Sequence, residues 1–248
     1  MLETIIPTKS EISIPQERYS NIGTYIQSAE AFSRNMFRPV FIVDMYKKNF
    51  LYISEKFSFL LDYTKSDHLF SSGQQYIPSL AHEEISTLKV IFEKAYDLFL
   101  SYPIADRMKL VFSYSFNSHC YGRKRVVRQS LTPLALTDDG DLWLVLCITS
   151  LSSSKTPGKY VMRLNTNNEY MLYNPEKGRW YFKEGIYLTS EEKEILLLSS
   201  QGYTMKEIAT ILCKSLDSIK MHKRVLFSKL DVKCITEAVL ASLNGNLI

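Results

Sequence analysis

The chain has 248 residues, and 46% of them are apolar, so two modest domains can each bury a hydrophobic core. Its formal net charge of +4 is too small to indicate a binding partner unless the charge is concentrated in one segment. The longest purely apolar run, residues 142–148, is far shorter than the roughly 20 residues that span a membrane, which excludes a transmembrane helix there.

The cysteines and the first residues indicate a cytoplasmic protein. Cys120, Cys147, Cys213 and Cys234 are widely separated and form no CxxC pair. Disulfide frameworks and zinc sites need closer, paired spacing, so we expect reduced thiols and no metal site. The N-terminus has an early acid and lacks the basic start and apolar run of a secretory signal. We therefore expect a cytoplasmic location.

The first part of the chain is predicted to mix helices and short strands. Apolar side chains at helical spacing predict a helix that Pro39 ends, because proline disfavours helix in the residue before it. A long apolar stripe predicts a second, longer helix that Pro103 closes. The expected elements are helices over 16–37, from Glu55, and over 82–100, with strands over 40–43 and 50–53.

Three more strands are expected before a break in composition. They cover 109–116, 123–136 and 142–149, and Asp138-Asp139-Gly140 favours a turn before the last of them. This order of elements predicts an α+β fold with one five-stranded antiparallel sheet and helices on one face. A linker follows over 151–158, and we interpret 156–185 as a β-type connector.

Helix-start signals become dense after residue 186. Thr189 with Glu192, and Thr204 with Glu207, are two capping boxes, and Gly202 between them is a typical helix stop. A third helix is expected from Ser215 to about residue 230, and a fourth over about 235–244. The pattern predicts a small four-helix domain over 186–248.

The third of these helices carries the positive charge. Between residues 214 and 233 there are six basic residues and two acids. Ile219, Leu226 and Leu230 form its apolar stripe, with His222 in the same row, and polar residues fill the opposite face. A basic outer face on such a helix, with a short helix just before it, fits the major groove of DNA. The alternative is an amphipathic helix whose lysines are a solvated surface.

Site residues follow from this interpretation. Lys220 and Arg224 can donate to guanine O6 and N7, and Met221 can contact thymine methyl groups. Hydroxyls near helix starts and lysines on the flanks suit phosphate oxygens. The expected phosphate contacts are Thr204, Lys206, Ser218, Lys223 and Lys229.

The segment LTSEEKEILLLSSQGYTMKEIATILCKSLDSIKMHKRVLFSKLDV resembles the LuxR-type helix-turn-helix of quorum-sensing and NarL/FixJ-like regulators. The resemblance covers about a quarter of the chain and implies that the third helix reads bases through Lys220, Met221 and Arg224. The segment departs from the family pattern at three positions. Glu191 stands where arginine is usual, Lys214 where an aliphatic residue is usual, and Val225 where asparagine is usual. The resemblance also implies a homodimer formed through the fourth helix, by Ile235, Ala238, Val239, Ser242 and Leu243.

The order of elements over 40–150 resembles a PAS domain, a sensor fold often found before such a module. No cofactor motif is identified: the flavin-binding cysteine motif is absent, and His82 alone does not indicate heme. The many tyrosines and phenylalanines can line a small-molecule pocket or fill the core, and the sequence does not identify a ligand. A phosphoreceiver domain is disfavoured because the alternating βα pattern is missing.

No catalytic residue or metal site is identified, so we do not expect an enzyme. The sequence instead predicts a dimeric, DNA-binding transcription regulator with a PAS-like sensor domain over 1–155, the connector over 156–185 and the helix-turn-helix domain over 186–248. The alternative is an interaction module that docks RNA polymerase or another regulator without reading DNA.

Overall fold

A computed structural model describes residues 14–36, 38–54, 82–120, 123–164, 169–245 and 247–248. The chain divides into two compact units, one comprising 1–151 and 156–183 and the other 152–155 and 184–248. The strands are β1 (Val40–Asp44), β2 (Asn49–Ile53), β3 (Leu110–Cys120), β4 (Arg123–Leu136), β5 (Leu142–Leu151), β6 (Tyr160–Leu164), β7 (Tyr170–Asn174) and β8 (Arg179–Lys183). The helices are α2 (Gln16–Tyr19), α3 (Ile22–Asn35), α4 (His82–Ser101), α5 (Ile104–Arg107), α6 (Ser190–Ser200), α7 (Met205–Ile211), α8 (Leu216–Leu230) and α9 (Ile235–Asn244).

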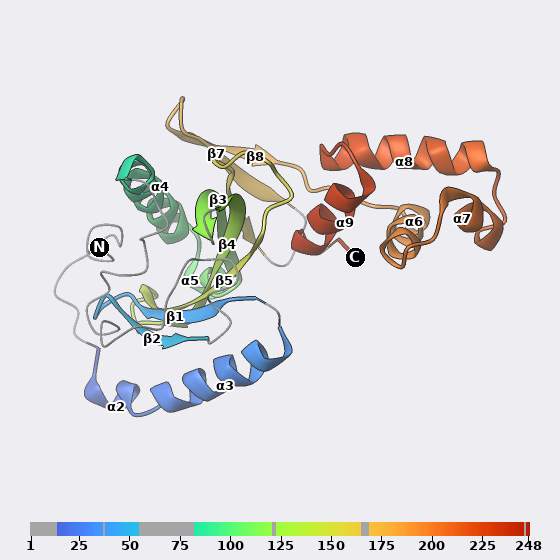
Figure 1. The fold of residues 1–248 in the computed structure, drawn as a ribbon. Helices are drawn as coiled ribbons and strands as arrows, with labels where there is room; N and C mark the ends of the chain where they lie inside the picture. Colours follow the sequence, from blue (N-terminus) through green and yellow to red (C-terminus); the bar gives the residue numbers. More distant parts are fainter. Residues whose placement is uncertain (1–13, 37, 55–81, 121–122, 165–168, 246) are drawn as a thin grey trace. The chain divides into compact units, whose positions relative to one another are not determined.

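The first unit is built on one antiparallel sheet with the strand order β2-β1-β5-β4-β3-β6-β7-β8 (Figure 1). The five strands predicted from the sequence are adjacent in it, in the order β2-β1-β5-β4-β3, and three further strands continue the sheet. β6 pairs with β3, so most of the segment interpreted as a connector belongs to the sheet. The physical reason is that Tyr160 and Met162 on β6 are buried in the same core as β3.

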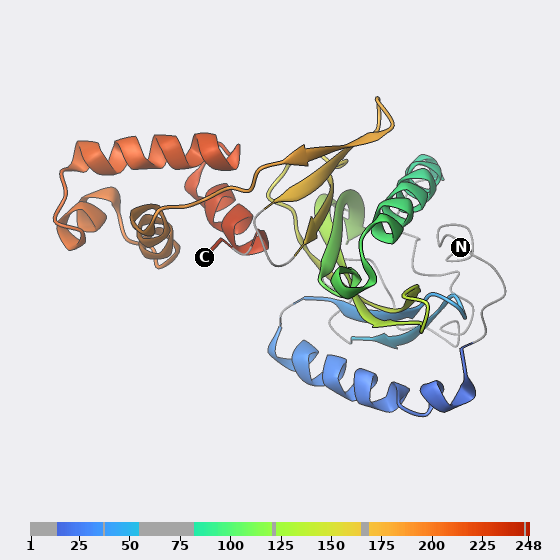
Figure 2. The ribbon, with the colours of Figure 1, turned by 180° about the vertical axis from the view of Figure 1, so that it is seen from behind.

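Helices cover both faces of this sheet, so the expectation of helices on one face is wrong. Val40 and Ile42 of β1 pack with Ala29 of α3, whereas Phe41 and Val43 lie in the core with Ile91 of α4. Figures 1 and 2 show α3 and α4 on opposite sides of the strands. The continuous apolar run of β1 reflects this burial from two sides, since a half-exposed strand alternates apolar and polar residues.

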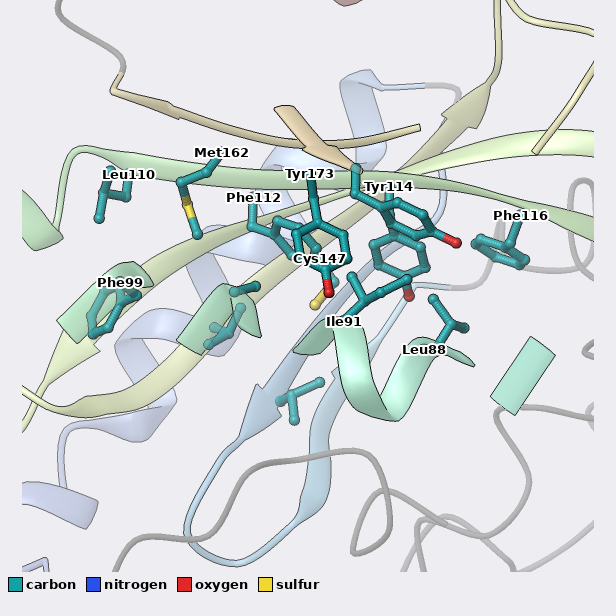
Figure 3. Close-up of a cluster of buried hydrophobic side chains, with 14 of the residues drawn as sticks. Leu88, Ile91, Phe99, Leu110, Phe112, Tyr114, Phe116, Cys147, Met162 and Tyr173 are labelled. Atoms are coloured by element: carbon teal, nitrogen blue, oxygen red, sulfur yellow. The ribbon is translucent and has the colours of Figure 1, made fainter. Parts of the chain in front are cut away.

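The α4 side of the sheet holds the main core of the unit. Figure 3 shows Phe112 and Tyr114 of β3 directed toward Leu88 and Ile91 of α4. The β8 strand adds to this core, because the Trp180 indole N–H donates to the carbonyl of Lys94 in α4 at 3.1 Å. Most of the aromatic side chains of these strands therefore lie in the hydrophobic core.

The predicted first helix is split into α2 and α3. The α2 segment is held by its own tertiary contacts: the Tyr19 hydroxyl donates to Asp44 Oδ2 at 2.9 Å, and Arg18 donates to the Leu136 carbonyl at 2.7 Å. Asp44 is fully buried and also accepts the amides of Tyr46 and Lys47, so it organises the β1–β2 turn. The short helix expected from Glu55, and the side chain of His82, lie outside the described residues.

Among the described helices, none is long and apolar enough to cross a membrane.

Candidate nucleic-acid interface

The four C-terminal helices begin at the predicted caps. The Thr189 hydroxyl accepts the Glu192 amide, and the Glu192 carboxylate accepts the Thr189 amide at 2.8 Å. Thr204 and Glu207 repeat this arrangement at the start of α7. Ser215 accepts the Ser218 amide at 3.1 Å, which starts α8. Each cap satisfies amide groups that the helix itself leaves without a partner.

The buried stripe of α8 anchors it to the neighbouring helices. Ile219 lies in a cluster with residues of α6 and α7, and Leu226 and Leu230 lie in a second cluster with α6 and α9. The small Ala209 on α7 is buried in the first cluster. Because both ends of α8 are fixed in this way, its opposite face is held outward as a rigid surface.

That outward face contains the three residues predicted to read bases. Lys220 and Arg224 are exposed, and Met221 is 56% exposed. Lys220 forms an exposed ion pair with Asp217 at 3.0 Å, a pair too solvated to hold the lysine strongly. Two exposed cations therefore lie beside an apolar side chain, which is a suitable set for guanine and thymine edges in a major groove.

The predicted phosphate contacts differ in their surroundings. Lys206 is exposed, whereas Lys223 is half-buried, and burial lowers its pKa. Thr204 is exposed, but its hydroxyl donates to Glu207 at 2.7 Å as part of the capping box. Ser218 lies in the first turn of α8, where its amide is already bonded to Ser215.

Lys229 has a structural partner instead. Its ammonium donates to both oxygens of Glu192, at 2.7 and 2.8 Å, and Glu192 is only 3% exposed. A phosphate contact would break these bonds and leave a buried carboxylate without its cation. Lys229 thus joins α8 to α6, and the phosphate contact predicted for it from the sequence would compete with this ion pair.

Two departures from the LuxR-type pattern meet in space. Lys214 Nζ lies 3.0 Å from Glu191 Oε1, and His222 Nε2 lies 3.4 Å from Glu191 Oε2. The first contact is an ion pair without the alignment of a hydrogen bond. Glu191 thus ties the start of α6 to the loop before α8 and to α8 itself. The two positions are 23 residues apart in the sequence, and no local pattern indicates that their side chains meet.

The predicted dimer residues on α9 fall into three groups by burial. Ala238 and Ser242 are 0% exposed, and Ala238 packs with Leu226 and Leu230 inside the domain, so neither is available to a second chain. Ile235 and Val239 are partly buried against the same cluster. Leu243 is 46% exposed and is the one member of the set with a largely open side chain.

A phosphate contact by Lys223 leads to a measurable expectation. Lys223→Ala should weaken binding to all duplex sequences alike and lower the slope of log affinity against log salt by roughly 0.9, since one fewer counterion is released. Filter binding over a salt series measures this slope. Lys193→Ala, an exposed lysine on α6, is the charge-matched control. An unchanged slope in Lys223→Ala contradicts the contact.

Comparison with known proteins identifies the C-terminal domain. Residues 187–242 match the family model of bacterial regulatory proteins, luxR family. Response regulator protein VraR from Staphylococcus aureus and its counterpart from Staphylococcus epidermidis are each 41% identical over 61 residues. This match covers 25% of the chain and 29% of each of those proteins. The helices α6–α9 are therefore a LuxR-type helix-turn-helix domain.

Two solved structures align over nearly the whole chain at low similarity. The crystal structure of a phage VqmA–DPO complex shares 16% identity at a TM-score of 0.36, covering 91% of each chain. A Vibrio cholerae VqmA dimer without target DNA shares 13% identity at a TM-score of 0.32, covering 94% of this chain and 89% of that chain. TM-scores below 0.5 do not establish a common fold.

Proposed function

We propose that this chain, whose C-terminal domain belongs to the luxR family of bacterial regulatory proteins, is a DNA-binding transcription regulator that acts as a homodimer under control of its N-terminal sheet domain. The observation that carries the proposal is the outward face of α8, where Lys220, Met221 and Arg224 are exposed while Ile219 and Leu226 anchor the helix. The α8 helix enters the major groove, and its three exposed side chains contact base edges.

In a dimer, two copies of α8 would meet successive major grooves about one helical turn apart. A selection from random duplexes with the full chain tests this directly. We expect enrichment of paired half-sites with that spacing, each containing guanine. Recovery of random sequences after repeated selection at low salt contradicts specific binding, and the protein would then be an interaction module.

The dimer is expected to depend on α9. Leu243→Asp should give a monomer and weaken binding to the selected site at least tenfold, because each half-site is then bound alone. Light scattering after gel filtration gives the mass, and a mobility shift gives the affinity. Leu197→Asp on α6 is the matched control, since Leu197 is 44% exposed and Leu243 is 46% exposed. Equal mass and affinity in the two variants contradict an α9 interface.

Control by a small ligand is supported by polar groups inside the apolar core of the sheet domain. The Tyr114 hydroxyl donates to Gln129 Oε1 at 2.6 Å, and Gln129 lies opposite Thr149 on the adjacent strand. The buried Thr149 hydroxyl has no hydrogen-bond partner among the described residues. Convergent polar groups in an apolar setting are typical of ligand sites. Repeating the selection with and without a cell-extract metabolite pool tests whether such a ligand changes DNA affinity.

A further inference from the structure

The outward face of α8 contains a second apolar side chain beside Met221. Val225 is 43% exposed, and among the described residues neither it nor Met221 packs against the buried clusters of the helix-turn-helix domain. Residues four apart on an α-helix are neighbours on one face, so Val225 lies one turn beyond Met221. Lys220 and Arg224 have the same spacing. We call Met221 and Val225 the apolar pair.

The apolar pair and the two cations form two rows along α8. With about 3.6 residues per turn, Asp217 and Ser228 fall between these rows, and both are exposed. Val225 is therefore about as far round the helix from the middle of the face as Lys220 is, on the opposite side. A helix that inserts this face into a groove brings Val225 to the base edges along with Lys220.

The chemistry of the major groove offers a partner of matching size for the apolar pair. Single exposed apolar residues are common on protein surfaces, but these two are neighbours and lie beside the cations predicted to contact guanine. Two side chains are too few for a protein partner, because a specific protein interface uses about 20–30 residues from each side. The apolar group that base edges present in the major groove is the C5 methyl of thymine.

The spacing of the pair limits which thymines it reaches. Four residues of α-helix rise about 6 Å along the axis, and successive nucleotides of one strand are about 3.4 Å apart along the duplex. The two side chains therefore reach methyl groups that are about two base-pair steps apart in the same groove.

We propose that Val225 is a further specificity-determining residue, which contacts the methyl group of one thymine while Met221 contacts that of a second thymine about two base pairs away. This inference rests on the proposed function and adds to it the prediction that each half-site contains two thymines recognised through their methyl groups. The asparagine usual at this position in the LuxR-type pattern would instead present hydrogen-bonding groups to the duplex.

Single replacements of thymine by deoxyuridine in the selected site test the proposal, because deoxyuridine keeps the O4 acceptor and the base pairing and lacks only the methyl group. For the full chain we expect about fourfold weaker binding at two positions of each half-site, which corresponds to the burial of one methyl-sized group. In Val225→Ala one of these positions should become insensitive to the replacement, and in Met221→Ala the other. Both substitutions truncate exposed side chains, so the fold should be kept.

Val90→Ala is the matched control, since Val90 is a 50% exposed valine on α4. This variant should keep both sensitive positions. If the selected site contains no thymine whose methyl group affects affinity, or if Val225→Ala keeps every sensitive position of the wild type, the proposal is overturned while sequence-specific binding stands. If the selection recovers no site at all, the proposed function fails and this proposal fails with it.

Discussion

Replacing Lys220 and Arg224 together by alanine is expected to abolish sequence-selective DNA binding and leave the fold intact. Each side chain is exposed and packs against no buried cluster, so the truncation creates no cavity. A good bidentate contact to a base contributes about 1–3 kcal/mol of discrimination against the wrong base. Loss of two such contacts, about 2–6 kcal/mol, corresponds to about a thirtyfold or greater loss of preference for the selected site.

The measurement is a competition mobility shift in which the selected site and a scrambled duplex compete for the full chain. The control variant Lys183→Ala with Lys193→Ala removes the same charge from exposed positions on β8 and α6. It should retain the preference for the selected site. If the Lys220, Arg224 variant discriminates between the duplexes as well as the wild type does, another surface of the protein reads the sequence.

The sequence predicted the helix-turn-helix domain accurately because its signals are local. A capping box needs only a threonine and a glutamate three residues apart, and Thr189 with Glu192 and Thr204 with Glu207 form the predicted bonds. The exposed face of α8 follows from helical periodicity in the same way. Such features depend on short stretches of chain, so their chemistry can be inferred without knowledge of the tertiary fold.

Features that depend on contacts between distant residues were missed. The bonds from Lys229 to Glu192 join residues 37 positions apart, and a lysine on a basic helix gives no sign of such a partner. The burial of Ala238 was equally hidden, because apolar spacing on α9 does not tell an internal stripe from an intermolecular one. The pairing of β6 with β3, which extends the sheet, likewise depends on register between separate segments.

Glu192 is expected to be the most important single side chain for the stability of the helix-turn-helix domain. Its carboxylate accepts the Thr189 amide and binds the Lys229 ammonium, so Glu192→Ala removes a helix cap and an ion pair together. Breaking a buried pair costs about 3–5 kcal/mol, and the part-exposed Lys229 reduces this, since its ammonium can be rehydrated. We expect a loss of about 2–4 kcal/mol in all, with the cap contributing about 1 kcal/mol. A domain of this size has only a few kcal/mol of stability, so it should unfold on mild heating.

The positions of the tryptophans make this loss measurable in the full chain. Both tryptophans, Trp143 and Trp180, lie in the sheet domain, so their fluorescence reports that unit alone. Far-ultraviolet circular dichroism also reports the helices of the second unit. In Glu192→Ala, the guanidinium midpoint of the helix signal should fall while the fluorescence midpoint stays unchanged. Coincident shifts of both signals contradict a local role for Glu192.

Low pH should destabilise the helix-turn-helix domain, as the Glu192→Ala substitution does. Burial favours a higher pKa for Glu192, but the Lys229 ammonium and the Thr189 amide outweigh it and hold the pKa below its usual range. The stabilisation is therefore complete above the unfolded-state pKa of about 4.3 and is lost as the pH falls through the lower folded-state value.

Glu192→Gln keeps an acceptor for the cap but carries no charge, so the guanidinium midpoint of its helix signal should lose the part of the acid dependence that Glu192 contributes. Glu207→Gln changes the second capping box, where the Thr204 amide and hydroxyl also lower the pKa of Glu207 but no ion pair among the described residues holds its carboxylate. It should therefore remove a smaller part of the acid dependence than Glu192→Gln does. An acid dependence in Glu192→Gln as large as that of the wild type would assign the titration to the other carboxylates with lowered pKa values, Glu207 and Glu237.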